Sequence, residues 1–430
     1  MKVSYYSLGC KVNLYESEAI INEFIDNGFE LASFDDICDV YIINTCSITA
    51  VSDAKSRKVI RQAVKRNPDA IIAVMGCYAQ LNPDKIEEIP GVSVILGTNK
   101  RHLLFSLVME QFESRYPKRI IDPISKVKEY EEIKIKRYNN KTRGFVKIQD
   151  GCNNFCSYCT IPYARGPVRS RNKDEILSEI QLLTDEGMRE IILTGINTAS
   201  YGQDLVHIDF ADLLEDIFLN TKNLGRVRIS SIEITEINDK LLAVLKRYQD
   251  HFCLHLHVPL QGGTDKTLKN MYRKYAIEEY RQKIKQIRTI FPFINITTDI
   301  LAGFAMETES DFLEGYRFIG EMNFGEMHVF PYSKRPLTAA YQFTDHINNE
   351  EKTKRVHQLL ELNKIKAVQY RKLWVGKTVE VLVEKVVDNI AYGHTSNYLQ
   401  VTFQGAVQTN DLVKVTLIND TYPISKGVIQ

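Results

Sequence analysis

The first hundred residues alternate short apolar runs with stretches in which apolar residues recur at helical spacing. The apolar runs lie at 3–8, 40–44 and 70–75, and the helical stretches lie at about 15–27 and 52–66. Because parallel strands need a long connection across one face of a sheet, strands that alternate with helices indicate a parallel sheet. We therefore expect an α/β protein that begins with a doubly wound parallel-sheet domain over residues 1–115.

A charged segment follows this domain. Residues 116–140 are rich in Lys, Glu, Arg and Tyr, and the run KVKEYEEIKIKR is typical of a solvated connector more than of a core element. We therefore expect a charged linker and a domain boundary here.

The alternation of strands and helices resumes after the linker. Six apolar runs lie at 144–148, 190–193, 226–230, 253–258, 294–301 and 326–330. Six such repeats predict a parallel barrel or partial barrel, and a long helix at about 349–373 marks its end. We place this partial (βα)6 barrel at residues 141–372.

The pattern changes again from residue 373 onward. Short alternating strands are predicted at 378–383, 398–403 and 411–418, with Gly and Asn at the turns and no clear helix. Such a segment is typical of a small all-β barrel. Residues 373–430 are therefore expected to form a module of their own.

Composition narrows the function classes. With 430 residues, 44% of them hydrophobic and 25% charged, the chain is a multi-domain globular protein. The formal charge of +1 excludes a chain that is basic throughout, so a nucleic-acid surface must be a local patch. The first residues have no apolar signal core and no stretch of eighteen apolar residues occurs, so we expect a cytoplasmic protein without a membrane partner. In that reducing compartment eight cysteines favour thiols or metal ligands over disulfides.

Three of these cysteines lie close together in the sequence GCNNFCSYC. Cys152, Cys156 and Cys159 directly follow a predicted strand. A 4Fe–4S cluster needs one ligand on each iron, so three thiolates leave one iron open to a substrate or cofactor. A zinc site is the alternative, but it needs a fourth Cys or His nearby, and none follows for tens of residues. The spacing therefore favours an iron–sulfur cluster.

This spacing, with the aromatic Tyr158 before the last cysteine, resembles the signature of the radical S-adenosylmethionine (SAM) superfamily over residues 141–371. The resemblance implies that the amino and carboxylate groups of SAM bind the open iron. It also implies that an electron from the cluster cleaves SAM into methionine and a 5′-deoxyadenosyl radical. Ligands of parallel βα folds collect at the C-terminal ends of the strands, where the cysteine loop lies.

Candidate cofactor contacts therefore lie at the same rim of strand ends. Besides Tyr158 they are Thr194, Gly195, Asn197, Ser230, Ser231, Glu233, Gln261, Asp299 and Gly303. The two glycines permit close backbone approach, and Glu233 can accept hydrogen bonds from ribose hydroxyls or a methionyl ammonium. The alternative for each residue is an ordinary loop or cap position. We expect His255 and His257, on one face of a strand, to be packed or rim residues and not ligands.

Three further cysteines each follow a predicted parallel strand, in SLGC, INTC and VMGC. Such strand ends share one edge of a doubly wound sheet, so Cys10, Cys46 and Cys77 can converge although they are far apart in sequence. Buried small side chains are the alternative, and we assign that role to Cys38 and Cys253. The equivalent loop positions favour metal ligation and predict a second cluster with one open iron.

The two triads together resemble the radical SAM methylthiotransferase family over essentially the whole chain. That family joins an N-terminal three-cysteine domain to a radical SAM barrel and a C-terminal TRAM module, which binds RNA. The resemblance implies two 4Fe–4S clusters and two molecules of SAM per turnover, one for the methyl group and one for the radical. It also implies that the second cluster holds the inserted sulfur and that C–H becomes C–SCH3.

The motifs GCKVNLYES, NTCSITAVSDAKSRKVIRQA and QDGCNNFCSYCTIPYARGPVRSR most resemble one group within this family. That group methylthiolates N6-threonylcarbamoyladenosine at position 37 of tRNA, beside the anticodon. The isopentenyladenosine group usually has Gln-Met where Lys11 and Val12 stand here. The alternatives are isopentenyladenosine in tRNA, an aspartate of a ribosomal protein and, in a different class, a non-catalytic iron–sulfur sensor that binds RNA.

The expected partners follow from this reading. Arg165, Arg169 and Arg171 lie just past the cluster loop, where guanidinium groups can bind phosphates of a tRNA anticodon stem-loop. The TRAM resemblance adds Lys377 and Tyr398 as RNA contacts. The reaction also requires an electron donor such as flavodoxin or ferredoxin, and we expect a monomer.

One motif departs from the family. After the fifth barrel strand the family usually reads Gly-Phe-Pro-Gly-Glu-Thr, whereas this chain reads GFAMET, with Ala305 and Met306 in place of Pro and Gly. The change concerns the geometry of that turn and leaves the cysteine framework as it is.

Overall fold

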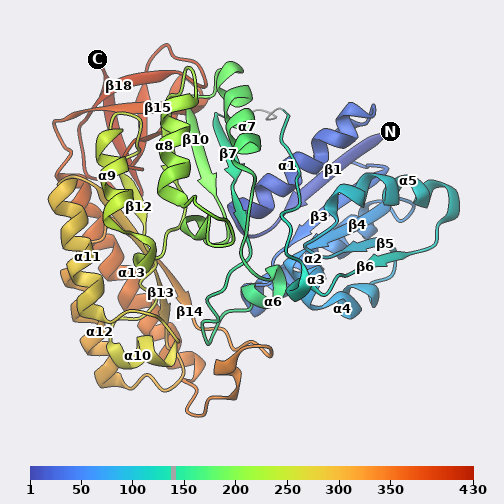
Figure 1. The fold of residues 1–430 in the computed structure, drawn as a ribbon, viewed down its shortest axis with the longest axis horizontal. Coiled ribbons are helices and arrows are strands. Elements are labelled where there is room, and N and C mark those ends of the chain that lie inside the picture. The colour runs from blue at the N-terminus through green and yellow to red at the C-terminus, as the bar shows by residue number, and fades with distance from the viewer. Residues whose placement is uncertain (137–141) are drawn as a thin grey trace.

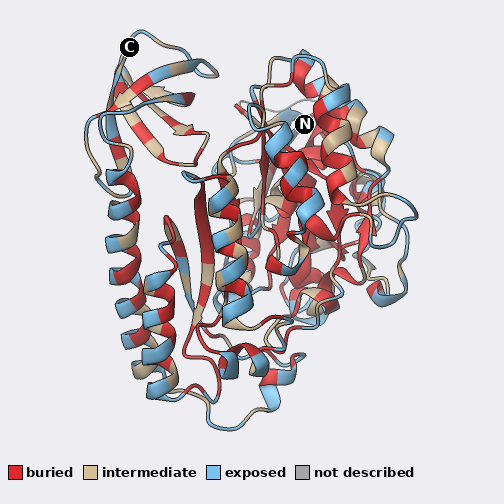
Figure 2. Cartoon of the chain, turned by 60° about the vertical axis from the view of Figure 1, so that its left-hand side comes forward, coloured by how far each residue is buried: buried red, intermediate tan, exposed pale blue. Residues whose placement is uncertain are grey.

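A computed structural model describes residues 1–136 and 142–430. Three bodies follow one another along the chain: an N-terminal sheet domain, a central set of strands wrapped by helices, and a small C-terminal barrel (Figure 1). Most of the central strands are buried, while β14 (Glu326–Pro331) is largely exposed or half-buried and the outer helices alternate between buried and exposed positions (Figure 2). This is the α/β organisation that the hydrophobic pattern predicts.

The N-terminal domain is a six-stranded parallel sheet in the order β2-β1-β3-β4-β5-β6. Its strands are β1 (Lys2–Ser7), β2 (Glu30–Leu31), β3 (Val40–Thr45), β4 (Ile71–Gly76), β5 (Val92–Leu96) and β6 (Lys118–Ile120). Its helices are α1 (Lys11–Asp26), α2 (Ala50–Arg66), α3 (Cys77–Leu81), α4 (Pro83–Glu87) and α5 (Leu104–Ser114). Apolar residues of α1 and α5 pack on one face of the sheet and those of α2 on the other, so the domain is doubly wound.

The central domain has six parallel strands in two groups of three. They are β7 (Arg143–Lys147), β10 (Glu190–Thr194), β11 (Arg226–Ile229), β12 (His255–His257), β13 (Asn295–Ala302) and β14 (Glu326–Pro331). Bridges from Val227 to Phe252 and from Ser231 to His257 join the groups, which gives the order β7-β10-β11-β12-β13-β14. The predicted partial barrel is confirmed.

Helices follow the central strands and cover their outer side (Figure 1). They are α7 (Lys173–Asp185), α8 (Phe210–Asn220), α9 (Asp239–Arg247), α10 (Asp265–Asn270), α11 (Ile277–Ile290) and α12 (Glu309–Glu321). Between β7 and α7 the chain forms the short elements β8 (Gln149–Asp150), α6 (Ile161–Arg165) and β9 (Arg169–Ser170). The long helix α13 (Asn349–Lys372) ends the domain.

The C-terminal module is a closed five-stranded barrel in the order β15-β16-β17-β19-β18. Its strands are β15 (Thr378–Val387), β16 (Ile390–Thr395), β17 (Gln400–Gln404), β18 (Leu412–Leu417) and β19 (Ile424–Ile429). The architecture is consistent with a TRAM domain. The barrel sits at the N-terminal ends of the central strands, because Arg226 at the start of β11 donates to the His394 oxygen (2.9 Å) and Asn295 at the start of β13 donates to the Asn397 oxygen (2.9 Å).

The charged segment between the first two domains is not a solvated connector. Its first residues form β6, an edge strand of the N-terminal sheet. Further on, Ile133 and Ile135 are buried, and the Tyr130 hydroxyl donates to the Lys147 oxygen (3.1 Å). The prediction is wrong because Ile133 and Ile135 pack between the two domains, which composition alone does not reveal.

In the part of the chain that the structure describes, no helix combines the length and the apolar character needed to cross a membrane.

Candidate active site

The loop of Cys152, Cys156 and Cys159 leaves the short strand β8 through a tight turn at Gly151. This glycine has φ +76°, and a Cβ there would lie 1.8 Å from the Pro167 oxygen. The loop is then fixed by backbone bonds from Cys152 to the Gly166 oxygen (3.0 Å) and from Cys159 to the Cys156 oxygen (3.0 Å). The glycine turn and these backbone bonds therefore set where the cysteine loop begins and how it folds back on itself.

These three thiols fit a metal cluster. Burial raises the pKa of Cys152 to about 11, and burial followed by the neighbouring Cys156 raises the pKa of Cys159. Hydrogen-bond donors also point at the sulfurs, the Asn154 N–H at Cys152 (3.4 Å) and the Arg273 guanidinium at Cys156 (3.5 Å). Buried thiols that disfavour one another's ionisation gain most from a bound cation, because metal binding requires thiolates. Three such ligands leave one iron of a 4Fe–4S cluster open.

The second triad is assembled from three loops. Cys10 follows β1, Cys46 follows β3 and Cys77 follows β4, and these three strands are neighbours in the sheet. A Cβ at Gly9, whose φ is +94°, would lie 2.8 Å from the Cys46 sulfur, so the glycine leaves room for that thiol. Burial raises the pKa of Cys77 to about 12, and Cys46 and Cys10 act in the same direction. The predicted convergence of the three strand ends is thus observed, and the donor set fits a second cluster.

The two triads adjoin each other across the domain boundary. Thr160, which follows Cys159, donates to the oxygen of Ser47, which follows Cys46 (3.2 Å). Arg165 on α6 reaches in the same direction, and its Nε donates to the Cys77 sulfur (3.2 Å). Arg165 therefore touches the second triad directly, and Thr160 contacts the residue that follows Cys46.

Residues near the end of the central domain also contact the loop that follows Cys46. Arg335 donates to the Ser47 hydroxyl (2.9 Å) and pairs with Asp53 (2.7 Å), and Ser333 accepts from the Ala50 N–H (3.1 Å). The loop after Cys46 is therefore fixed by residues of both domains.

The three arginines expected to bind RNA phosphates are buried, with exposed fractions of 0% for Arg165 and Arg171 and 2% for Arg169. Arg165 pairs with Glu16 (2.5 Å), Arg169 donates to the Arg165 oxygen (2.8 Å), and Arg171 pairs with Glu132 and Glu179. Their prediction as RNA contacts is wrong, because each guanidinium already has partners inside the protein. Burial of such charges is favourable only when they are paired.

These arginines belong to a network that joins the first two domains. Glu16 on α1 contacts Arg101 of its own domain and Lys147 (2.8 Å) and Arg165 (2.5 Å) of the central domain. Asp150 lies on the other side and pairs with Lys147 (2.6 Å). Burial would raise the pKa of Glu16, but the surrounding Arg101, Arg165 and Lys147 hold it well below its ordinary value. The acids are therefore ionised, and the network acts as an electrostatic seam, which we define as Glu16, Arg101, Lys147, Asp150 and Arg165.

A cavity of about 570 Å³ opens between the three domains. The N-terminal domain contributes the segment from Gly9 to Val12, and the C-terminal barrel contributes His394, Tyr398 and Gln400. The central domain contributes, among others, Thr194, Gly195, Ser230, Ser231, His255, His257, Thr297, Glu326 and His328. The predicted rim residues Thr194, Gly195 and Ser231 thus share one cavity with Cys10.

The histidines that we expected to be packed or rim residues lie in this cavity. His257 shares the Thr297 hydroxyl with His255 (2.9 Å from each ring) and pairs with Asp299 (3.3 Å). The ring of His328 lies 5.6 Å from that of His257. The sequence analysis does not include His328 among the candidates. His328 lies on β14 and His257 on β12, with β13 between them, and the sequence alone does not show that these two strands bring the histidines together.

Lys11 is a further cavity residue that the motif analysis noted only as a departure from another group. It is the first residue of α1 and directly follows Cys10. Burial, followed by the positive charges of Arg228 and Arg143, lowers the pKa of Lys11 to about 8. The side chain is therefore directed into the cavity and toward the first strands of the central domain.

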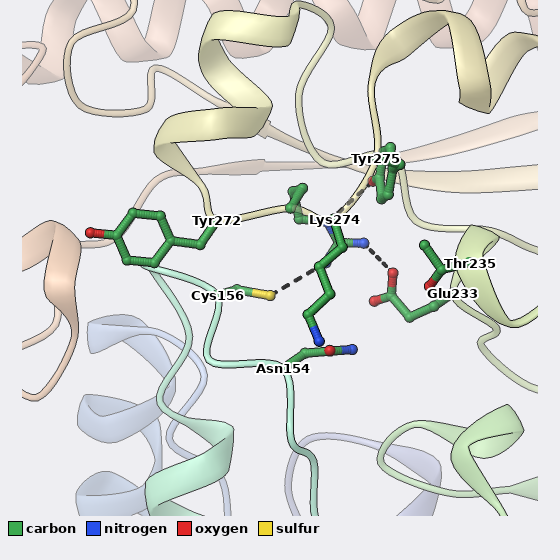
Figure 3. A pocket seen from close by; sticks show the side chains of 8 residues that line it. Asn154, Cys156, Glu233, Thr235, Tyr272, Lys274 and Tyr275 are labelled. Atoms are coloured by element: carbon green, nitrogen blue, oxygen red, sulfur yellow. Dashed lines mark hydrogen bonds and ion pairs between the residues drawn. The ribbon is translucent and has the colours of Figure 1, made fainter. Parts of the chain in front are cut away.

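A smaller pocket lies beside Cys156 (Figure 3). It is lined by Asn154, Cys156, Glu233, Thr235, Tyr272, Arg273, Lys274 and Tyr275. Arg273 pairs with Glu233 and lies 3.5 Å from both the Cys156 sulfur and the Tyr158 hydroxyl. Glu233, predicted as an acceptor for SAM, is thus positioned by an arginine that the sequence analysis missed.

The other predicted cofactor contacts have structural partners. The Asn197 side chain donates to the Ser200 hydroxyl, and the Asn197 backbone N–H donates to the Gln149 side-chain oxygen (2.9 Å). Gln261 has φ +68° and bonds through its backbone to Asp299 (2.8 Å). For Asn197 and Gln261 the ordinary loop role is what the structure shows, and contact with SAM stays a prediction.

The two predicted RNA contacts of the C-terminal module lie at its junction with the central domain. The Lys377 ammonium lies over the rings of Phe293 (4.5 Å) and Trp374 (5.3 Å). Tyr398 lies 4.6 Å from the Arg228 guanidinium and stacks on His255 (4.7 Å). Tyr398 therefore forms part of the cavity floor.

Met306 has φ +67° in the turn where the family has glycine. Its neighbour Ala305 is buried, and the Met306 N–H donates to the Asp345 oxygen (3.1 Å). The substitution thus leaves the turn intact but places a side chain in the left-handed region, which costs about 1–2 kcal/mol for a residue other than glycine.

Two protein-family models match this chain. The model described as "Uncharacterized protein family UPF0004" matches residues 2–97, and that of the Radical SAM superfamily matches residues 146–319. The threonylcarbamoyladenosine tRNA methylthiotransferase MtaB of Bacillus subtilis (strain 168) is 41% identical over 99% of this chain and 95% of that protein. The tRNA-2-methylthio-N(6)-dimethylallyladenosine synthase of Desulfitobacterium hafniense (strain Y51) is 34% identical over 97% of this chain and 95% of that protein.

Solved structures show the same fold. The radical SAM methyltransferase TsrM from Kitasatospora setae superposes with a TM-score of 0.58, over 79% of this chain and 76% of that one, at 14% identity. At this identity the likeness concerns the arrangement of helices and strands alone.

Proposed function

The chain belongs to the radical SAM methylthiotransferase family, and from this premise we propose that it converts N6-threonylcarbamoyladenosine at position 37 of tRNA to its 2-methylthio derivative. The observation that carries the proposal is the contact between the segments that hold the two triads, through Thr160 and Ser47 and through Arg165 and Cys77. Sulfur insertion at an unactivated carbon needs a radical source and a sulfur donor side by side, and adjoining triads supply both positions.

The enzyme uses two 4Fe–4S clusters and SAM. Cys152, Cys156 and Cys159 would hold the radical cluster, and Cys10, Cys46 and Cys77 the second cluster. When bound, these groups supply one-electron cleavage of SAM and the sulfur and methyl group that are transferred, which no side chain can provide.

The protein's own residues position these groups. Arg273 and Arg165 each direct a guanidinium at one cysteine sulfur, at 3.5 and 3.2 Å, and so favour its thiolate form. The cavity between the domains offers the space in which an adenine can lie beside Cys10, away from bulk water. We propose that Thr194, Gly195 and Ser231 contact SAM or the nucleoside in this cavity, and that Asp299, which pairs with the cavity residue His257, and Tyr158, beside Arg273, also contact SAM.

The substrate assignment is supported by the sequence motifs and by the relatives. Relatives named for threonylcarbamoyladenosine and for dimethylallyladenosine, the isopentenyl nucleoside, both align along nearly the whole chain. The higher identity, 41% against 34%, supports the former. We further propose that the tRNA anticodon stem-loop is the partner, that flavodoxin or ferredoxin supplies electrons, and that the protein acts as a monomer.

Nucleoside mass spectrometry on tRNA from a deletion strain tests the substrate. We expect the 2-methylthio form of N6-threonylcarbamoyladenosine to disappear and the unmodified nucleoside to accumulate, because no methylthio group is then inserted. If the methylthio form persists while that of isopentenyladenosine is lost, the substrate assignment is wrong.

An anaerobic assay with dithionite tests the enzymatic reading itself. The reconstituted protein should release 5′-deoxyadenosine from SAM, and the variant with Cys152, Cys156 and Cys159 all changed to Ala should not. A reconstituted wild-type protein that releases none would favour the iron–sulfur sensor.

A further inference from the structure

The ammonium group of Lys11 lies in the cavity without an acid of its own. Among residues 1–136 and 142–430, neither a hydrogen bond nor an ion pair holds it. Its side chain lines the cavity directly beside Cys10 and is half-buried. A partly buried charge without a partner is unfavourable, so such a group indicates a place where a ligand supplies the opposite charge.

The acids that pair with the cations around Lys11 are already engaged. Glu190 accepts from Arg226 (2.6 Å) and from Arg228 (2.7 Å), and Glu384 pairs with Arg143 (3.1 Å). Arg228 and Arg143 are also the two cations that act most strongly on Lys11. Cations therefore outweigh acids around Lys11, where Glu190 offsets only part of the positive charge.

The rest of the cavity adds little negative charge. Its other polar groups include hydroxyls such as that of Thr297 and the rings of His255, His257 and His328. The carboxylate of Glu326 is the acidic group among the cavity-lining residues, and it accepts from the Tyr422 hydroxyl (3.3 Å) and lies 3.9 Å from Arg371. An anionic group on a ligand in this cavity would therefore find an unpaired cation at Lys11.

We propose that Lys11 binds the carboxylate of the threonylcarbamoyl group and thereby selects this nucleoside over isopentenyladenosine. The inference rests on the proposed function, since it names the group by which the same site recognises its substrate. Threonylcarbamoyl carries a carboxylate, whereas the isopentenyl group is an uncharged hydrocarbon. An apolar group against Lys11 leaves the ammonium desolvated and unpaired, and a site built for a charged partner rejects analogues that lack it.

The covalent geometry of adenine supports the same placement. Atoms C2 and N6 flank the same side of the purine ring, on either side of N1. If C2 faces the second triad, a group on N6 lies close to the same triad, within reach of the residue after Cys10. Lys11 is that residue, and its side chain points into the cavity.

A binding cycle with the full chain and its clusters tests this pairing. The probes are anticodon stem-loops that carry either N6-threonylcarbamoyladenosine or its carboxyl methyl ester, and the proteins are the wild type and Lys11→Met. We expect esterification to weaken binding to the wild type about tenfold, the range of one charge-assisted hydrogen bond. Lys11→Met should bind the acid about tenfold more weakly and should not distinguish the acid from the ester.

Two further variants keep the test decisive. Lys11→Arg preserves the charge and should retain the preference for the acid, and Lys11→Gln removes the charge with a polar side chain of similar length. Iron content is measured for each protein, because Lys11 adjoins Cys10. If Lys11→Met loses iron, Lys11→Gln takes its place in the cycle.

Two results would overturn the inference. If the losses from esterification and from Lys11→Met add, the ammonium acts on another group, such as an RNA phosphate or the cluster. If the wild type binds the acid and the ester equally, no residue reads the carboxylate. The proposed function fails separately, when the wild type does not methylthiolate the threonylcarbamoyl stem-loop at all.

Discussion

Cys152, Cys156 and Cys159 lie in one loop, whereas Cys10, Cys46 and Cys77 come from three strand ends spread over residues 10–77. We name these sets the local triad and the dispersed triad. The local triad needs one turn at Gly151 and a few backbone bonds to take its shape. The dispersed triad needs a correctly paired sheet, and it is completed by side chains of the next domain, such as Arg165. The local triad therefore depends on the conformation of one loop, whereas mutations elsewhere in the N-terminal sheet or in the next domain can disturb the dispersed triad.

The two triads nevertheless share one local device. Cys10, Cys77 and Cys152 are each preceded by a glycine with positive φ, of +94°, +100° and +76° respectively. In each case a strand ends, the chain reverses at a residue without a side chain, and the thiol is placed beyond the sheet edge. Only glycine adopts this conformation without strain.

The largest expected effect separates the roles of the triads. Changing Cys152, Cys156 and Cys159 together to Ala should lower iron from about eight to about four per chain and abolish 5′-deoxyadenosine formation. Changing Cys10, Cys46 and Cys77 to Ala should lower iron equally but leave SAM cleavage measurable while methylthiolation is lost. Iron analysis and product chromatography on the two variants check this, and equal loss of SAM cleavage in both would contradict the division of roles.

The next effect tests whether the dispersed triad depends on the electrostatic seam. Glu16→Gln leaves Arg101, Lys147 and Arg165 with too little negative charge, so the free energy of unfolding should fall by about 3–5 kcal/mol. Urea denaturation measures this, and iron should be lost from the dispersed triad first. Glu88→Gln on the exposed surface is the matched control, with an expected change within about 0.5 kcal/mol.

The pH dependence of stability gives a second test of the role of Glu16. Because its cationic neighbours hold the pKa of Glu16 below its ordinary value, the wild type has the full stabilisation above that ordinary value and loses it as the pH falls below it. Glu16→Gln has no such group to protonate and should lose less stability over the same acid range. A variant as acid-sensitive as the wild type would show that Glu16 is not the group responsible.

A smaller effect compares the turns before the cysteines. Gly151→Ala places a Cβ 1.8 Å from the Pro167 oxygen, and Gly9→Ala places one 2.8 Å from the Cys46 sulfur. We expect losses of about 2–4 kcal/mol and about 1–3 kcal/mol, each with iron lost from the adjoining triad alone. Gly28→Ala is the matched control, because Gly28 has φ +86° but nothing within 4 Å of the added atom, so only strain of about 1 kcal/mol remains. Thermal unfolding and iron content report both quantities.

The smallest effect lies outside both triads. Met306→Gly relieves the left-handed strain and should raise the free energy of unfolding by up to about 1 kcal/mol, offset in part by the backbone entropy of glycine. Iron content should stay unchanged. A loss of iron in this variant would mean that the turn after β13 supports a triad after all.

The sequence-based predictions succeeded where a pattern is local. The hydrophobic pattern predicts the strands of the central domain to within about two residues, and the short spacing of Cys152, Cys156 and Cys159 predicts that they lie together. The start of α1 was placed at about residue 15, whereas the helix begins at Lys11, because the turn at Gly9 lets Cys10 act as its N-cap.

The predictions failed where partners are remote in sequence. The basic run after the cluster loop gave no sign that Arg165 meets Glu16, which lies far earlier in the chain. The same holds for Glu131 of the linker, which pairs with Arg101 (2.9 Å) and so is drawn into the interface. Charge along a sequence shows where ions are available, and only the fold shows which of them are already neutralised.

The electrostatic seam also limits how this protein can be recombined with its relatives. A chimaera that takes its first domain from one relative and its barrel from another inherits Glu16 and Arg101 from one parent, and Lys147, Asp150 and Arg165 from the other. Unless the two halves carry matching charges, a buried ion is left alone at the junction. We therefore expect functional chimaeras to take the N-terminal domain and the central domain from the same parent. The C-terminal module is the part that tolerates exchange, because it is held largely through backbone oxygens such as those of His394 and Asn397.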